Sequence, residues 1–574
     1  MPRLPLVLCA AVALAACETS RPAMTTPPDA GTTSPVSPSQ VDGVVGPADV
    51  DYDAVASLDY DEHVRPLLAA RNVLSPTAGG VGDPGDYTID DVVMAGPSGF
   101  VVPFDSEGSL MLRFVRDLPA TAAIPFPNLR TLEPDEVRYL ARWIEAGARG
   151  PDGAAPFSDA TDLLFAGIQG ENHVAIVDAE TLRLIRRIDF DEHGVPSAPY
   201  GPHHFAFEPD GSAAYVSLVS AGVVAKVSLD LTLDPADPAV LLGRTDGSFA
   251  TPGMMSLDPS SSRLFVGRST LSDPLANGFG ILDRETMDVE VVATPFNVPH
   301  ALAATPDGRY AITAELTGTQ AVSRALVYDA QSGDAAIVPI PSDGEPREFI
   351  HFSILGAHHM GGMAGHHMGG MAGHHMGDGA SMPGMGGAGY PYTVTLTSRS
   401  TDEVLFFSLS EDGELTMTGS APAGDGPYHA HANHDGSDLL IPDQRGDAVT
   451  ILDAETRETT KTIEAAPLSQ PHSPAPSRDG SRFFVTSSNL DGAWTPDYLF
   501  LSADGQPQGP EAFGNLAAFA PTGELLGVVQ LGTYPSGLEP VSLPGGAGMD
   551  HEERGHEGMN HGGSGHMNMN HGNQ

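Results

Sequence analysis

The sequence contains almost no cysteine and little positive charge. Its 574 residues include only two cysteines, Cys9 and Cys17, and only two lysines, Lys226 and Lys461. The chain beyond residue 17 can therefore form no disulfide. Acidic residues outnumber Lys and Arg by 74 to 28, giving a formal net charge of −46. Such a charge excludes nucleic acid as a partner and disfavours anionic membrane surfaces, whereas it favours metal ions.

Long hydrophobic runs are also missing, and the one apolar segment lies at the N-terminus. "MPRLPLVLCAAVALAAC" has Arg3, a short apolar run and the ending Leu-Ala-Ala-Cys. The run is too short for a permanent membrane span. Its ending resembles the bacterial lipobox, which implies a signal peptide over 1–16 and a lipid on Cys17. Glu18 follows, and this implies an outer-membrane lipoprotein that faces the periplasm or the cell surface. The alternative is an ordinary signal peptide that is cut elsewhere.

Two short regions precede the main body of the chain. Residues 17–57 are rich in Pro, Thr, Ser, Asp and Gly, and we expect a flexible tether there. Over 58–150 the apolar spacing becomes helical. Val64, Leu67 and Leu68 form one stripe, and Pro134 precedes two acidic residues at a predicted helix start. The sequence therefore predicts a small α-helical domain.

This domain resembles cytochrome c-like domains of bacterial surface proteins. The resemblance rests on Val64-Arg65-Pro66, Ser109-Leu110 and Trp143-Ile144. Where that family has CxxCH, residues 72–76 read Asn-Val-Leu-Ser-Pro, and Ile124 stands in place of the axial Met. Covalent haem needs both thiols and strong axial ligands, so we expect no haem. The domain would then serve docking or structure, and an unrelated helical spacer is the alternative.

From about residue 160 short strand patterns repeat. "VAIVDAETLRLIRRI" (174–188) returns at 279–292, 325–338 and 449–463, and "PHHFAFEPDGSAAYV" (202–216) returns at 299–313 and 471–485. The period of roughly 40 to 55 residues is typical of four-stranded propeller blades. First strands near 203, 253, 300, 349, 430, 472 and 515 predict a seven-bladed β-propeller over 160–532. The outer strands of its last blade would be supplied by 163–190. The pattern resembles YVTN-type propellers, so the fold class is mainly β after the helical domain.

Histidines recur at one position of these blades. His203, His300 and His472 each stand six residues before the equivalent position of a Pro-Asp-Gly-like turn. Innermost strands line the propeller channel, so these side chains should converge, and imidazole suits copper and zinc. The predicted channel ligands are His203, His204, His300, His351, His429, His431 and His472. The set resembles the seven-histidine copper cluster of nitrous oxide reductases, although no cysteine is present for their second copper domain. Alternatively, these histidines hydrogen-bond neighbouring strands, as in YVTN blades.

Two low-complexity tracts share the same kind of ligand. Thioethers favour Cu(I), and imidazoles take Cu(II) and Zn(II). The first tract lies in an insertion, 356–390, predicted to be a disordered loop near a channel mouth. Its predicted ligands are His358, His359, Met360, Met363, His366, His367, Met368, Met371, His374, His375 and Met376. The second tract lies in a predicted disordered tail, 533–574. Its predicted ligands are His551, His556, His561, His566, Met567, Met569 and His571.

Together these patterns predict an extracytoplasmic lipoprotein that binds copper for sequestration or delivery. Nucleophile motifs and Gly-rich phosphate loops are missing, and we predict no catalytic residue. Two other functions stay open. One is a copper oxidoreductase with its centre in the propeller channel. The other is an interaction module in which a propeller face binds a protein partner and the tracts have no metal role.

Overall fold

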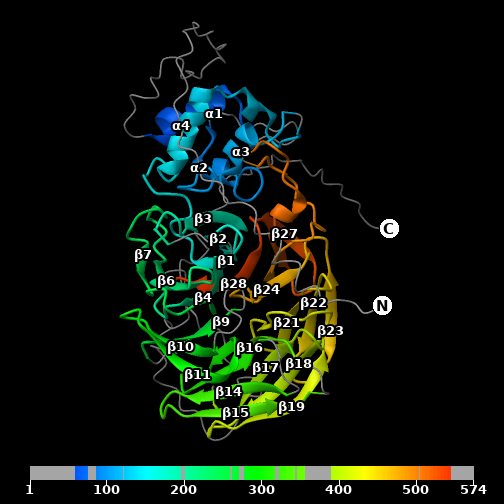
Figure 1. The fold of residues 1–574 in the computed structure, drawn as a ribbon. Coiled ribbons are helices and arrows are strands. Elements are labelled where there is room, and N and C mark those ends of the chain that lie inside the picture. The colour runs from blue at the N-terminus through cyan, green and yellow to red at the C-terminus, as the bar shows by residue number, and fades with distance from the viewer. Residues whose placement is uncertain are drawn as a thin grey trace, which may run out of the picture.

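The computed structural model describes most of the chain between residues 58 and 544. The described ranges are 58–74, 86–120, 122–195, 201–258, 261–269, 277–316, 322–342, 346–355, 389–502 and 504–544. They hold a small helical part followed by a large β part (Figure 1).

The described residues of the helical part form six short helices. They are the π-helix η2 (Tyr60–Val64), α1 (Arg65–Ala70), α2 (Ile89–Met94), α3 (Leu110–Arg116), the 3-10 helix η4 (Pro127–Thr131) and α4 (Pro134–Glu145). The predicted helix at Pro134 is present. It starts with Pro at a first-turn position, and the Glu133 and Glu136 side chains form a capping box with the backbone there.

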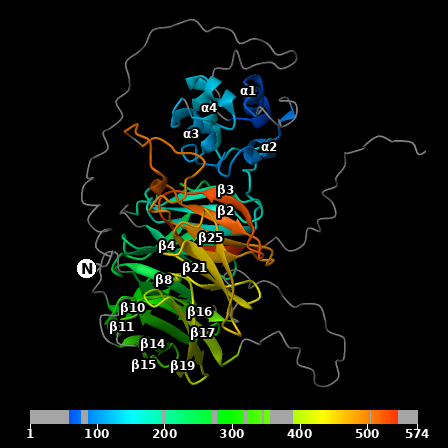
Figure 2. The same cartoon turned by 90° about the vertical axis from the view of Figure 1, so that its right-hand side faces the viewer.

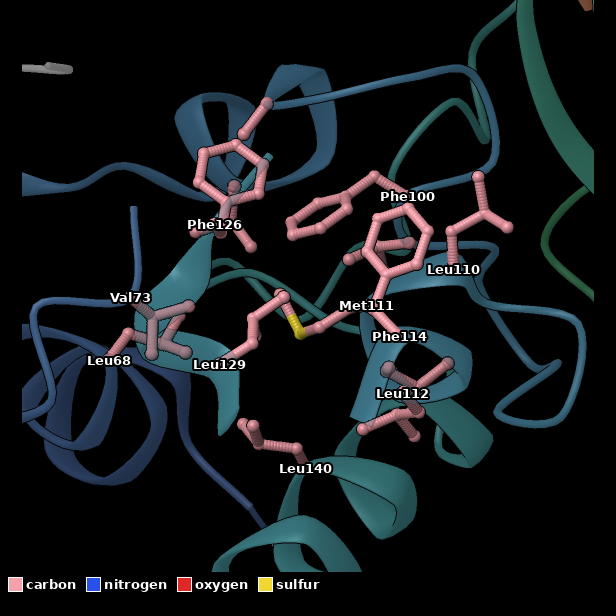
Figure 3. Close-up of a cluster of buried hydrophobic side chains, with 14 of the residues drawn as sticks. Leu68, Val73, Phe100, Leu110, Met111, Leu112, Phe114, Phe126, Leu129 and Leu140 are labelled. Atoms are coloured by element: carbon pink, nitrogen blue, oxygen red, sulfur yellow. The ribbon is translucent and has the colours of Figure 1, made fainter. Parts of the chain in front are cut away.

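An apolar core holds these helices together. Figure 3 shows Leu68, Met111, Phe114, Leu129 and Leu140 converging between the helices. The core also extends beyond the helical part, because Phe500 and Phe513 are buried in the same cluster. Each large apolar side chain buried in this way stabilises the fold by about 1.5–3 kcal/mol.

The β part is a seven-bladed propeller, as the repeats predict. Each blade is a four-stranded antiparallel sheet. From innermost to outermost strand, the first three blades are β28 (Pro535–Ser542), β1 (Asp162–Ile168), β2 (His173–Asp178) and β3 (Arg183–Asp189); β4 (Pro202–Phe207), β5 (Ala213–Leu218), β6 (Val223–Ser228) and β7 (Leu241–Arg244); β8 (Pro252–Leu257), β9 (Arg263–Arg268), β10 (Asn277–Asp283) and β11 (Val289–Asn297).

The other four blades follow in chain order. They are β12 (Pro299–Ala304), β13 (Tyr310–Glu315), β14 (Ser323–Asp329) and β15 (Ala335–Ile340); β16 (Phe349–Leu355), β17 (Tyr392–Ser398), β18 (Glu403–Leu409) and β19 (Leu415–Pro422); β20 (His431–Ala432), β21 (Asp438–Asp443), β22 (Ala448–Asp453) and β23 (Thr459–Glu464); β24 (Pro471–Pro476), β25 (Phe483–Ser487), β26 (Asn515–Phe519) and β27 (Leu525–Gln530). A further 3-10 helix, η5 (Pro510–Ala512), precedes β26.

The ring closes as predicted through a blade shared by the two ends of the propeller, but with a different strand. The segment near 515 is β26, the third strand of its blade, and the closing innermost strand is β28. β28 pairs with β1 from Asp162↔Ser542 to Ile168↔Pro535. The predicted boundary at residue 532 is therefore wrong, because the propeller extends through Ser542.

The helical part lies against one edge of the propeller, beside β2 and β3 (Figures 1 and 2). Arg187 of β3 forms an ion pair with Asp105 at 3.1 Å. Arg183 donates hydrogen bonds to the carbonyl oxygens of Met94 and Gly96. The loop that carries Phe500 reaches up from the next blade into the helical core. Among the described residues, no helix is long and apolar enough to cross a membrane.

Candidate metal centre

The innermost strands begin with a repeated local distortion. In five blades the innermost strand begins with a proline: Pro202, Pro252, Pro299, Pro471 and Pro535. In a sixth blade Pro427 stands just before β20 and forms an isolated bridge to Asp443. The pairing register shifts just after this point in β4, β8, β12, β16 and β24. Such a bulge redirects side chains, and it often lies beside functional sites.

Backbone strain and hydroxyl groups fix this distortion. Four residues that directly precede a strand proline, Thr251, Val298, Gln470 and Tyr534, have φ between 47° and 56°, a conformation that costs non-glycine residues energy. In the bulges, amide N–H groups are bound by hydroxyls of the second strand. His204 N–H donates to Ser217 Oγ at 3.0 Å, and His351 N–H donates to Thr397 Oγ1 at 3.1 Å. The histidines therefore lie on backbone with little freedom to move.

The blade histidines meet on the propeller axis. The ring of His203, from β4, lies 5.8 Å from that of His300 on β12, 6.0 Å from that of His429 before β20 and 6.1 Å from that of His472 on β24. None of these strands neighbours β4 in the ring, because β8 or β28 lies between them. Side chains from non-neighbouring blades come this close only at the axis. The predicted convergence of these four residues is therefore confirmed.

Three of these side chains have the geometry of a metal site. One nitrogen each of His203, His300 and His429 lies within 4.8 Å of the other two. His300 Nδ1 donates to the carbonyl oxygen of Arg268 at 2.8 Å, which leaves Nε2 free to act as a ligand. Both ring nitrogens of His203, His429 and His472 are buried and have no hydrogen-bond partner among the described residues. Buried polar groups are nearly always satisfied, so this cluster fits a metal ion.

The electrostatics of the cluster also suit a cation. Burial lowers the pKa of His300 to about 4 and that of His472 to about 3. Burial and neighbouring imidazoles hold the pKa of His203 and His429 well below the ordinary value. All four rings are therefore neutral at neutral pH, and neutral imidazole is the form that binds metal.

Two of the other three predicted channel histidines lie beside a carboxyl group that the sequence analysis missed, and the third stacks on its neighbours. His204 Nε2 lies 3.5 Å and His431 Nε2 lies 4.0 Å from Oε1 of Glu539 on β28. His351 stacks between His429 and His431, with ring centroids 5.1 and 4.7 Å away. Burial raises the pKa of Glu539 to about 8. The proline that begins β28 is the signal by which this strand can be found, because four other innermost strands also begin with proline.

The cluster is closed to solvent. The seven histidines are at most 6% exposed, so at this level the predicted channel is filled by side chains. Tyr428 stacks on His429 with a centroid distance of 5.1 Å and packs edge-on against His472 at 4.5 Å. Tyr428 is itself half-buried, and it separates the imidazoles from the surface.

The His/Met tracts and Cys17 lie outside the described residues, and their predicted roles remain predictions. The flanks of the insertion are described, however, and they show where it leaves the propeller. The insertion leaves β16 after Leu355, at the end where other blades have their Pro-Asp-Gly turns. His351 lies four residues earlier in β16, about 13 Å along an extended strand. The tract therefore departs from the end of the strand remote from the cluster.

Comparisons with known proteins reveal no family. No family model and no curated protein matches the chain. Hydrazine synthase of Kuenenia stuttgartiensis is similar over 59% of this chain and 91% of its own, with 15% identity and a TM-score of 0.41. Dihydro-heme d1 dehydrogenase NirN in complex with DHE is similar over 78% of this chain and 94% of its own, with 12% identity and a TM-score of 0.40. Similarities this low carry no argument about function.

Proposed function

We propose that this protein binds a transition-metal ion on the propeller axis, through His203, His300 and His429 with His472 beside them. The observation that carries the proposal is the set of buried ring nitrogens without hydrogen-bond partners, in a group whose ligand atoms lie within 4.8 Å of one another. A purely structural role would leave these nitrogens bonded to neighbouring strands. A bound metal ion would instead bond to one nitrogen of each ring.

Copper is the ion that best agrees with the whole sequence. Imidazole ligands accept copper and zinc, and copper binds more tightly than zinc at a given site of this kind. The two tracts add thioethers such as Met360 and Met567, which favour Cu(I), whereas a zinc store needs none. We propose that the tracts bind copper loosely and that the axial site holds it firmly.

The proposed place of action is outside the cytoplasm. The lipobox-like ending at Cys17 supports a lipoprotein of the outer membrane. Burial of the axial histidines supports retention of a bound ion in preference to rapid exchange. Sequestration or delivery of copper is therefore the function that we infer, with the lipid as the anchor.

A copper oxidoreductase is the second candidate, and the convergence of four imidazoles from separate blades favours it. Such a site requires that a substrate reach the metal. His429 and His472 are fully buried, so the structure as it stands offers a substrate no direct contact with these ligands. Retention of a bound metal ion needs no access for a substrate, so it explains the burial of these ligands more simply.

The test compares metal binding by two full-length variants with that of the wild type. The first variant carries His203→Asn, His300→Asn and His429→Asn, and the second carries His434→Asn on an exposed turn. We expect the first to lose a tightly held Cu(II) ion together with its electron paramagnetic resonance signal, whereas the second keeps both. Equal copper content and identical spectra in all three proteins would exclude an axial site, and turnover of a substrate by copper-loaded protein would favour the oxidoreductase.

A further inference from the structure

Glu539 is a buried acid placed directly beside the histidine cluster. It lies on β28, the closing strand, and only 8% of its side chain is exposed. Its carboxylate lies within 4.0 Å of ring nitrogens from β4 and β20. Within the described part of the chain, its ion-pair contacts are both with histidine, and no Lys or Arg is within salt-bridge distance.

The surroundings of His204 indicate which groups donate and which accept. Its Nδ1 accepts a hydrogen bond from the amide of Met255 at 3.3 Å. A neutral ring then carries its proton on Nε2, and this nitrogen faces Glu539 at 3.5 Å. Both nitrogens of His204 thus have partners, and His204 is not among the three histidines whose nitrogens lie within 4.8 Å of one another. His204 therefore positions the carboxyl group of Glu539, while its predicted role as a metal ligand stays a prediction.

The cluster needs negative charge if it is to hold a divalent cation. Its imidazoles are neutral ligands, so a dication bound by them alone keeps its full charge in a buried site. Burying an uncompensated charge is costly. We propose that Glu539 is the charge-compensating residue of the axial site and makes it selective for divalent over monovalent ions. This inference rests on the proposed function.

Selectivity follows from the charge of the ion. Burial raises the pKa of Glu539 to about 8 in the metal-free protein, so a bound dication must displace its proton before the residue carries its charge. The ionised carboxylate attracts a dication twice as strongly as a monocation of the same size and position. Removing the charge while keeping the shape should therefore weaken divalent binding more. Glu539→Gln does this, because the amide oxygen still accepts the proton of His204. Residues that surround metal ligands without binding the metal commonly change metal affinity by about 10- to 100-fold when replaced.

The experiment measures how Zn(II) and Ag(I) raise the melting temperature of full-length, metal-free protein. Ag(I) serves as a redox-inert monovalent probe. The contribution of the axial site is the rise in melting temperature of a protein minus the rise of the His203/His300/His429→Asn variant at the same ion concentration. Other sites contribute equally to both rises. For Glu539→Gln we expect Zn(II) affinity to fall by about 10- to 100-fold, while Ag(I) affinity stays within experimental error. Glu539→Asp, which keeps the charge, should recover part of the Zn(II) affinity.

The controls separate this inference from the proposed function. Glu315→Gln removes another buried carboxylate, which pairs with Arg324 at 3.2 Å, and should leave both affinities unchanged. Equal losses for Zn(II) and Ag(I) in Glu539→Gln would overturn the inference, since they would indicate a positional role, and so would unchanged Zn(II) affinity. If neither ion stabilises the wild type more than the triple-histidine variant, the proposed function itself fails.

Discussion

Replacing His472 by Asn should remove a specific part of the pH dependence of stability. In the metal-free protein burial lowers the pKa of His472 to about 3 from an ordinary value of 6.5. Below pH 6.5 the unfolded chain therefore takes up a proton on His472, whereas in the folded protein this ring stays neutral until the pH approaches 3. The stability that this residue contributes is fully present above pH 6.5 and is lost as pH falls towards 3.

The magnitude follows from the size of the shift. Each pKa unit corresponds to about 1.36 kcal/mol, so between pH 6.5 and 4 the wild type should lose about 3 kcal/mol through His472 alone. The variant has no imidazole at this position, so its free energy of unfolding does not fall for this reason. The stability difference between wild type and His472→Asn should therefore shrink by about 3 kcal/mol between neutral pH and pH 4.

Urea unfolding of both metal-free proteins at several pH values measures this difference directly. Other groups titrate in the same range, including Asp443, whose pKa burial raises to about 7, and Glu539. Their contributions are common to both proteins and cancel in the comparison. Parallel stability curves from pH 7 to pH 4 would refute the view that His472 is buried as a neutral ring.

Three further predictions follow from the same structure. Tyr428→Ala should speed the exchange of axial metal with a chelator in stopped-flow measurements, because Tyr428 covers His429 and His472; an unchanged rate would mean that metal leaves by another route. Phe500→Ala should cost about 3–5 kcal/mol and free the helical part for limited proteolysis, because Phe500 is fully buried in its core; unchanged protease resistance would contradict this. Cys17→Ser should move the protein from the membrane fraction to the soluble fraction in its own host, unless the signal peptide is cut elsewhere.

Much of the fold follows from local patterns in the sequence. A strand with His203 near its start, followed six residues later by a turn, repeats clearly enough to predict blades and the convergence of equivalent histidines. The closing strand could not be predicted in this way. β28 pairs with β1 across 367 to 380 residues of chain, and the segment around Glu539 lacks both His and the Pro-Asp-Gly turn.

The roles of individual histidines were equally hidden from the sequence. His203 and His204 are neighbours, yet one contributes to the three-histidine site and the other contacts Glu539. A one-residue shift of register at the bulge decides which side chain points where. Sequence spacing alone contains no information about that shift, so it predicted seven equivalent ligands where the structure distinguishes two groups.

The most direct test of the central claim is the copper content of full-length protein after exhaustive washing with a chelator. We predict that the wild type and His434→Asn retain a copper ion that the His203/His300/His429→Asn variant lacks, while all three remain folded. Equal copper in the three folded proteins, or none in any of them, would contradict a metal centre on the propeller axis.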